Sequence, residues 1–451
     1  MRFLIYWALI ALIIFLPIPF GGVLPWTWSA MVLFVGVLTT IWGISALLGI
    51  TKPWKPPPAL TVACVLFLLV VFWALIQTLS VVPEGLHHPL WKTALEALGL
   101  PNGGSISLDP VASREHVLRI VAYGAIFWLA LQISRDRDSA ATLLYWICGA
   151  VSLNALYGLV VQFSGSNTIL WFEKTSYLDL VTGTFVNRNS FATYIGLGLI
   201  CATAILWDRA QLATRGITNP TERRRILLTQ MLEKNWPVLA SWFVLSVALL
   251  LTQSRAGTFA AIIALLTLII VLGARGARSR KSLIAPAVLT IVALLFVFRL
   301  SGSGLDARLH DTELAWSARS QIYDIALSAI DDTTLTGTGL GTFPSVYLSY
   351  ATHGSIRSVQ RAHSDYLELA VELGVPAAIL FITSLFVVTL ICARGVFRRS
   401  RDFVFPAAGL SASVLVGIHS IVDFSLQIPA VAVTYCIILG IASAQSSSFR
   451  D

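Results

Sequence analysis

Apolar stretches of about twenty residues recur along almost the whole chain, and they constrain its fold more than any other feature. A helix of that length crosses the hydrocarbon core of a membrane, so each stretch predicts one span. The chain is 56% hydrophobic and only 12% charged, which exceeds what a water-soluble domain of 451 residues needs. We predict an all-α polytopic membrane protein with about twelve transmembrane helices, at residues 3–20, 27–50, 59–82, 115–134, 140–163, 190–207, 237–253, 256–273, 282–300, 366–393, 403–424 and 428–446.

Lysine and arginine are spread very unevenly among the segments between these spans, which orients the chain. With the N-terminus inside, the cytoplasmic loops and tails hold 20 of the 31 Lys and Arg and 7 of the 23 Asp and Glu, a net +13, and the remainder is net −5. This is the bias that the positive-inside rule requires. The basic run at 221–225 is then a topological anchor, so the overall charge of +8 indicates no nucleic-acid partner. The predicted cytoplasmic loops are 51–58, 135–139, 208–236, 274–281 and 394–402.

Three segments on the non-cytoplasmic side, 83–114, 164–189 and 301–365, are too long to be simple turns. Short amphipathic helices are expected within them at Leu86–Leu100 and Ala318–Ile330. The largest segment also carries a Gly/Thr-rich stretch, 336–347 (TGTGLGTFPSVY). A phosphate cradle is one interpretation of its glycines, but such loops follow a strand in a βαβ unit. We favour a structural turn.

Arginines on the non-cytoplasmic side oppose the positive-inside rule, and small polar residues flank them. They are Arg188 in FVNRNS, Arg255 in LLTQSRAGTF, Arg319 in AWSARSQIYD and Arg361 in VQRAHSDY. Each could extend to lipid headgroups, as arginines near span ends often do. The flanking residues suit a water-filled cavity better, and the arginine fork binds phosphate oxygens in pairs. Several arginines at one membrane depth would form a site for a lipid-linked phosphate or diphosphate.

Histidines and carboxylates gather near the same side. His363 could cap the helix that enters the predicted span 366–393, where Asp365 and Glu368 complement the helix dipole. A neutral imidazole is also the usual general base for a sugar hydroxyl, and the residues alone leave both possibilities open. Farther along, His419 and Asp423 lie one turn apart in GIHSIVDFSLQIP. They could line the same cavity as Asp365 and Glu368, or hydrogen-bond each other.

Several of these motifs together resemble a known family. AHSDYLELAVELGVPAAILF is similar to the signature of the O-antigen ligase and O-antigen (exopolysaccharide) polymerase superfamily of bacterial membrane glycosyltransferases. TGTFVNRNSFATYIGLGL, LLTQSRAG, ARSQIYDIAL with LTGTGLGTFP, and HSIVDFSLQIPA occur in the family's order across residues 180–430. The family signature more often has Asn where this chain has Ser364, and serine can still hydrogen-bond there.

The resemblance implies a GT-C-type inverting glycosyltransferase in the bacterial inner membrane, with its active site on the periplasmic side. Its implied substrates are an undecaprenyl-diphosphate-linked oligosaccharide and a glycan or lipid acceptor, with no cofactor and no metal. The implied diphosphate-binding residues are Arg188, Arg255 and Arg319, and the implied catalytic residue is His363. We expect a single membrane domain, 1–451, whose large periplasmic loop, 301–365, lies between spans nine and ten.

Three functions are compatible with these residues. A polymerase joins two lipid-linked repeat units, whereas a ligase moves the finished glycan to lipid A-core. DFSLQIPA and residues 106–131 resemble exopolysaccharide or capsule polymerases slightly more than ligases. From a different class, a transporter or flippase of an anionic lipid-linked substrate could use the same arginines. A transporter would place ionisable groups near the membrane midplane, whereas here they cluster at the outer ends of spans.

Overall fold

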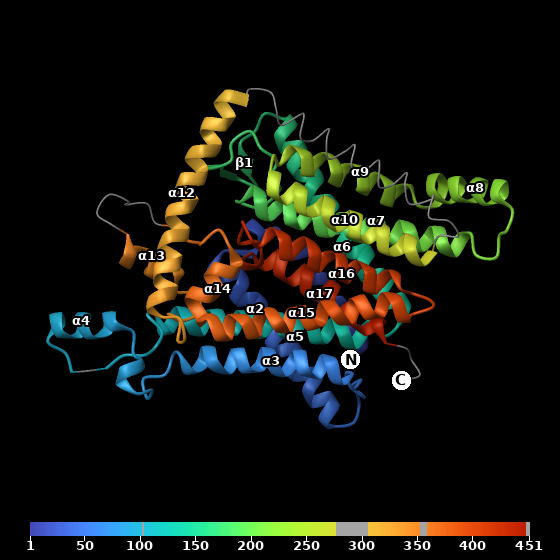
Figure 1. The fold of residues 1–451 in the computed structure, drawn as a ribbon. Helices are drawn as coiled ribbons and strands as arrows, with labels where there is room; N and C mark the ends of the chain where they lie inside the picture. The colour runs from blue at the N-terminus through green and yellow to red at the C-terminus, as the bar shows by residue number, and fades with distance from the viewer. Residues whose placement is uncertain (102, 277–304, 352–358, 448–451) are drawn as a thin grey trace.

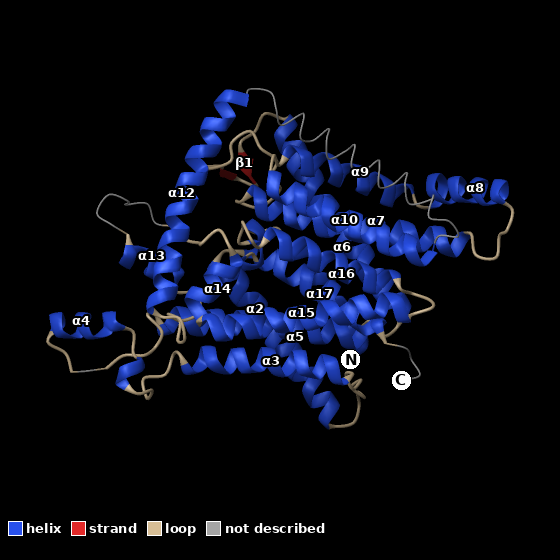
Figure 2. Ribbon diagram, viewed as in Figure 1, coloured by secondary structure: helices blue, strands red, loops and turns tan. Residues whose placement is uncertain are grey.

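The computed structural model describes residues 1–101, 103–276, 305–351 and 359–447, and almost all regular structure in this part is helical (Figure 2). Two short strands, β1 (Thr168–Ile169) and β2 (Phe172–Glu173), form an antiparallel hairpin. The helices are α1 (Arg2–Phe15), α2 (Pro25–Leu47), α3 (Pro58–Ile76), α4 (Pro89–Leu98), α5 (Pro110–Ile133), α6 (Arg137–Phe163), α7 (Arg188–Ala213), α8 (Pro220–Thr229), α9 (Trp236–Leu251), α10 (Arg255–Gly276), α12 (Leu305–Asp332), α13 (Phe343–Tyr350), α14 (Asp365–Leu373), α15 (Val375–Arg398), α16 (Val404–His419) and α17 (Pro429–Ser446).

Local sequence fixes where many of these helices begin. α2, α3, α5 and α17 each have proline within the first two positions, where no intrahelical N–H bond is lost. The Asp109 side chain caps α5 by accepting hydrogen bonds from the amides of Val111 and Ala112. Asp136 caps α6 in the same way, through the amide of Ser139.

Apart from α12, which stands across one end, the long helices run side by side and form one bundle (Figure 1). α7 and α17 are the most buried of the candidate spans. α17 packs against α5 and α16, α10 packs against α16 and α7, and α15 packs against α3. Small residues allow the close approach of these helices. An added Cβ at Gly440 of α17 would lie 2.7 Å from the carbonyl oxygen of Phe127 in α5, so any larger residue there would separate the two helices.

Eight helices of the described part are long and apolar enough to cross a membrane, or nine if α8 and α9, bent by 76°, form one span. α1 and α16 coincide with the predicted spans 3–20 and 403–424 but are shorter apolar helices. The predicted span 282–300 lies outside the described residues. The structure therefore confirms a multi-span helical protein, but the prediction of about twelve transmembrane helices is too high for the part described.

The predicted span 366–393 requires a second correction, because the chain breaks within it. α14 ends at Leu373 and α15 begins at Val375, with Gly374 between them at φ 78°. The carbonyl of Thr334 accepts the Val375 amide at 2.8 Å, so a distant loop sets the break. The candidate span starts at Val375, and α14 with its carboxylates precedes it.

The predicted cytoplasmic loops 51–58, 135–139, 208–236 and 394–402 lie at one end of the bundle, which we call the terminal end because both termini lie there (Figure 1). Most of the predicted loop 274–281 lies outside the described residues. Arg137 at the start of α6 donates to Asp208 of α7 and to Asp402 before α16, at 2.7 Å in each case. Arg275 of α10 donates to the carbonyl oxygen of Arg399. α12, α13 and α14 lie at the opposite end, the α12 end (Figure 1).

The Gly/Thr-rich stretch lies at the α12 end and is a structural turn, as predicted. The amides of Thr338 and Gly339 donate to the carbonyls of Val371 and Glu372, and the Phe343 amide donates to the Glu372 carboxylate. These amides are therefore already satisfied and cannot hold a phosphate. Gly337 has φ 65°, and a Cβ there would lie 2.3 Å from the amide nitrogen of Gly374.

Candidate functional site

Two helices begin side by side at the α12 end, and each has arginine as its first residue. Asn187 caps α7 ahead of Arg188, and Ser254 accepts the Gly257 amide ahead of Arg255 in α10. The Ser254 hydroxyl also donates to the Asn189 side chain at 2.8 Å, which joins the two helix starts. Two positive helix ends and two guanidinium groups thus converge on one region, and both favour a bound anion.

Arg188 lacks the partner that a half-buried arginine normally has. Its guanidinium lies over the Tyr177 ring, 5.5 Å from the centroid, and its Nε has no hydrogen-bond partner among the described residues. The charges of Arg319 and Arg255 both act on Arg188. The structure therefore brings together the three arginines that the sequence singled out, even though they repel one another.

α12 contributes the third arginine and also contacts residues 361–365, which contain His363 and which we call the histidine segment. Arg319 and Tyr323 are four residues apart and therefore share one face of α12. The Tyr323 hydroxyl donates to the carbonyl oxygen of His363 at 3.0 Å. The charge of Arg319 also acts on the His363 ring. One helix face thus positions both a candidate phosphate ligand and the candidate base.

His363 does not cap the following helix. The cap of α14 is Ser364, whose hydroxyl accepts the Leu367 amide, which excludes the capping interpretation of the imidazole. His363 has φ 54°, a conformation that costs energy for a non-glycine residue and marks functional positions. Its ring meets the Phe424 ring edge to face at 5.0 Å. Burial and, secondarily, Arg319 lower the pKa of His363 below its ordinary value, which keeps the imidazole neutral at pH 7.

His419 and Asp423 belong to a buried network behind this segment and do not hydrogen-bond each other directly. The Asp423 carboxylate accepts from Ser425 at 2.5 Å and from Asn189 at 3.5 Å. Thr193 of α7 hydrogen-bonds both His419 Nδ1, at 2.5 Å, and the Ser425 hydroxyl, at 2.8 Å. The charge of Asp423 also acts on His363, so the network links the start of α7 to the candidate base.

Asp365 and Glu368 have different surroundings although both are buried in α14. Glu368 is fully engaged, because one oxygen pairs with Arg361 at 2.8 Å and the other accepts the Ala362 amide. Asp365 accepts the Ser420 hydroxyl through Oδ2, but its Oδ1 has no partner among the described residues. Burial raises the pKa of Asp365 well above its ordinary value.

The structure adds partners that the sequence interpretation missed, namely Tyr177, Tyr323, Asn189, Thr193 and Ser425. Asn189 stands beside Arg188 in FVNRNS, which is a local signal. Thr193 and Ser425 gain their role where α7 packs against α16 and the segment before α17. Tyr177 and Tyr323 gain theirs through contacts with Arg188 and with the His363 carbonyl.

The fold and the candidate site together define a class of protein: a multi-span helical protein in which several arginines and a histidine gather at one end of the bundle. Residues 240–382 match the family described as O-Antigen ligase, Wzy_C. This part of the chain is therefore an O-antigen ligase family domain, from a bacterial family of membrane glycosyltransferases of the ligase and polymerase type. The family implies lipid-linked glycan substrates. No curated protein gave a match to the chain.

The matched region includes Arg255, Arg319 and His363 together with Asp365 and Glu368. Arg188, His419 and Asp423 lie outside it. They nevertheless join the same site through Asn189 and Ser254, so the site extends over helices on both sides of the matched segment.

Proposed function

We propose that this protein is an inverting glycosyltransferase that takes its glycan from undecaprenyl diphosphate on the periplasmic face of the bacterial inner membrane. The proposed reaction joins repeat units of a surface polysaccharide. One observation carries the proposal: the charges of Arg255 and Arg319 act on Arg188, Arg319 also acts on His363, and none of the three arginines has a carboxylate at ion-pair distance among the described residues. That arrangement is unfavourable in the free protein and favourable with a diphosphate bound.

Arg188, Arg255 and Arg319 would bind the diphosphate of the donor. As the anomeric C–O bond breaks, both bonding electrons pass to the diphosphate oxygen, and the negative charge on the leaving group grows. Guanidinium groups and helix N-termini fixed in place stabilise this charge without reorganising. In this proposal arginines, rather than a metal ion, neutralise the leaving group.

His363 would act on the acceptor. An acceptor hydroxyl attacks the anomeric carbon on the face opposite the diphosphate, and the imidazole takes the hydroxyl proton. A neutral ring is required for this step, which agrees with the lowered pKa of His363. Tyr323 and Phe424 would hold the segment in place, through the His363 carbonyl and the ring edge. Asp423 and His419 would act as positioning residues.

Within this chemistry we favour a polymerase over a ligase, because residues 106–131 and DFSLQIPA resemble polymerases slightly more. A deletion strain separates the two, since loss of a polymerase leaves single repeats and loss of a ligase leaves long undecaprenyl-linked chains. A transporter would consume no lipid-linked glycan when purified in detergent, where no compartments exist. Turnover in detergent therefore supports an enzyme and contradicts a transporter.

The decisive variant is His363→Ala, expressed in the deletion strain. We expect glycan transfer to be lost while the protein still reaches the membrane in normal amount. His87→Ala is the matched control, because the His87 ring hydrogen-bonds the Val82 carbonyl in a loop distant in sequence from the site. Near-normal glycan from His363→Ala would overturn the catalytic assignment.

A further inference from the structure

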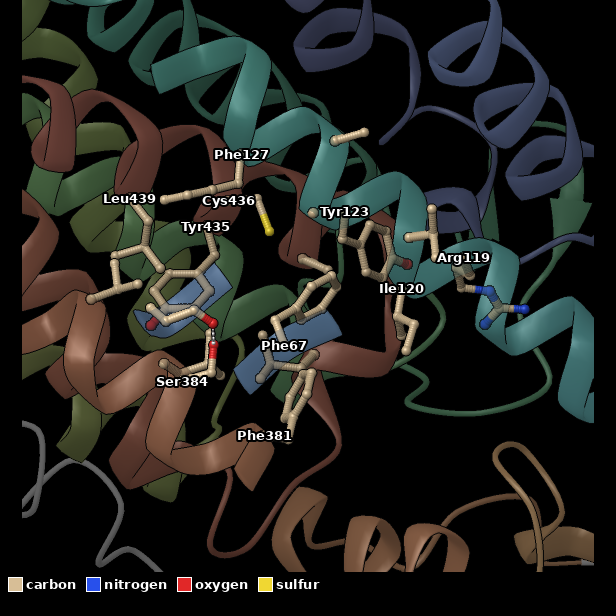
Figure 3. A pocket seen from close by; sticks show the side chains of 18 of the residues that line it. Phe67, Arg119, Ile120, Tyr123, Phe127, Phe381, Ser384, Tyr435, Cys436 and Leu439 are labelled. Atoms are coloured by element: carbon tan, nitrogen blue, oxygen red, sulfur yellow. Dashed lines mark hydrogen bonds between the residues drawn. The ribbon is translucent and has the colours of Figure 1, made fainter. Parts of the chain in front are cut away.

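A large apolar cavity lies inside the bundle, next to the histidine segment but separate from the three arginines. Its volume is about 480 Å³, and side chains of α3, α5, α15 and α17 form its walls. Figure 3 shows Arg119 and Tyr123 toward one end, Phe67 and Phe381 in the middle, and Tyr435 and Leu439 toward the other end. Asp365, two residues beyond His363, also lines it.

The shape of the cavity follows from one face of α5. His116, Arg119, Tyr123, Phe127 and Trp128 line it at helical spacing. At 1.5 Å per residue, positions 116 to 128 extend over about 18 Å along the helix. Arg119 is closer to the α12 end and Trp128 is closer to the terminal end. The cavity is therefore elongated in the direction in which a lipid chain lies in a membrane.

The end of the cavity nearest α14 is polar and unsatisfied. Arg119 is only 8% exposed, and its Nε has no hydrogen-bond partner among the described residues. The Tyr123 hydroxyl, His116 Nε2 and Asp365 Oδ1 are also buried without a described partner. Orphaned groups of this kind are costly, and four of them lining one cavity indicate a ligand that satisfies them. The Arg119 guanidinium stacks on the Trp28 ring at 4.6 Å, which fixes its position.

We propose that this cavity binds the isoprenoid chain of the acceptor, a second polyprenyl diphosphate, with its anionic head at Arg119. The inference rests on the proposed function, in which both substrates are lipid-linked, and adds the place at which the acceptor lipid binds. Arg361 supports the placement, because its charge acts on both Arg119 and His116. Arg361 and Asp365 flank His363 in sequence, so the donor arginines and the acceptor head meet the histidine segment from two sides.

The volume of the cavity suits one slender chain. About 480 Å³ is within the size range of a pocket for a single small ligand. The cavity would therefore hold the part of one isoprenoid chain that lies closest to the anionic head.

The test counts bound lipid on the full-length protein purified in detergent, with undecaprenyl diphosphate lacking glycan as the probe. We expect wild type to bind two equivalents. The Arg119→Met variant, which removes the charge but keeps the side-chain volume, should bind one equivalent of lipid fewer, and Arg119→Lys should bind two equivalents again. Cys436→Phe should also lose one, because Cys436 lines the cavity and the added ring would fill it (Figure 3). The matched control is Arg114→Met, an exposed arginine on the same helix, which should keep two.

Donor-site and cavity outcomes remain distinguishable in this design. Arg255→Met should lose the other equivalent, and the Arg119→Met/Arg255→Met double variant should bind none. If Arg255→Met keeps every equivalent while Arg119→Met loses one, the donor assignment fails and the cavity assignment stands. If Arg119→Met and Cys436→Phe both bind as much lipid as wild type, the cavity assignment is overturned.

Discussion

The two ends of the bundle treat arginine in opposite ways. At the terminal end, Arg137 donates to Asp208 and Asp402 at 2.7 Å, and Arg399 lies 3.5 Å from Asp402. At the α12 end, the charges of Arg255 and Arg319 act on Arg188, and none of these three arginines has a carboxylate at ion-pair distance among the described residues. Arg137 and Arg399 are thus neutralised within the chain, whereas the three arginines of the candidate site are not.

This difference separates structural from functional charge. A guanidinium held by two carboxylates joins helices and has little capacity for another anion. Neighbouring arginines that have no carboxylate partner raise the energy of the empty site, and a bound diphosphate removes that cost. Arg361 shows that pairing also occurs at the α12 end, because it binds Glu368 at 2.8 Å. Arg188, Arg255 and Arg319 thus differ from an arginine at the same end that does pair with a carboxylate.

The largest expected effect is a loss of glycan transfer without a loss of stability, at the arginines of the candidate site. Arg188→Met and Arg255→Met should each lower glycan transfer by about 10²–10³-fold, the usual loss when a fixed electrostatic ligand is removed. Neither should lower the melting temperature, since each removes a repulsion and no ion pair. Transfer rate and Tm are measured on the same purified protein. A large Tm decrease with normal transfer would reverse the assignment.

At the terminal end the opposite result is expected. Arg137→Met should destabilise the protein by about 1–3 kcal/mol, because Asp208 and Asp402 lose a charged partner while half-buried. The Tm in detergent should fall, and transfer by the folded protein should stay close to wild type. Arg209→Met is the control, since Arg209 hydrogen-bonds the Tyr145 hydroxyl, lies over its ring and forms no ion pair among the described residues. Loss of transfer at unchanged Tm would show that the terminal end also takes part in the reaction.

Sequence alone singled out several residues that the structure brings together at the candidate site, because their signals are local. Arg188 and Arg255 follow capping residues at the starts of apolar stretches, so their place at helix ends could be derived without a structure. His363 and Asp365 likewise stand directly before a helical pattern. The uneven distribution of Lys and Arg among the loops then assigned all of these positions to the non-cytoplasmic side of the membrane.

Features that depend on distant contacts could not be predicted. Hydropathy runs through Gly374, and the break there depends on the Thr334 carbonyl and the turn at 336–342. Arg119 lies inside the predicted span 115–134, where no flanking residue marks it. Its cavity forms only when α3, α15 and α17 pack around α5. The loop prediction 301–365 and the periplasmic location remain predictions.

A finer test uses pH to probe the charges around His363. Because burial and Arg319 lower the pKa of His363, the neutral base is present at neutral pH and is lost as pH falls through a midpoint below 6.5. Arg319→Met removes a charge that lowers this pKa and should move the acid limb of kcat/KM to higher pH. Asp423→Asn removes a charge that raises it and should move the limb to lower pH. An acid limb that neither variant moves would assign the titration to another group.

The smallest expected effect concerns Ser364, where the chain has serine and the family signature more often has asparagine. Ser364→Asn should leave stability and transfer close to wild type, because both side chains cap a helix through an accepting oxygen. Ser364→Ala should cost about 1 kcal/mol, since the Leu367 amide loses its acceptor. The loss should appear in Tm before it appears in transfer, because the Asp365 amide still holds the segment through the Ser420 and Asp423 carbonyls. If Ser364→Ala instead lowers transfer strongly at unchanged Tm, the serine contacts substrate, and the α12 end holds one more functional group than its charges reveal.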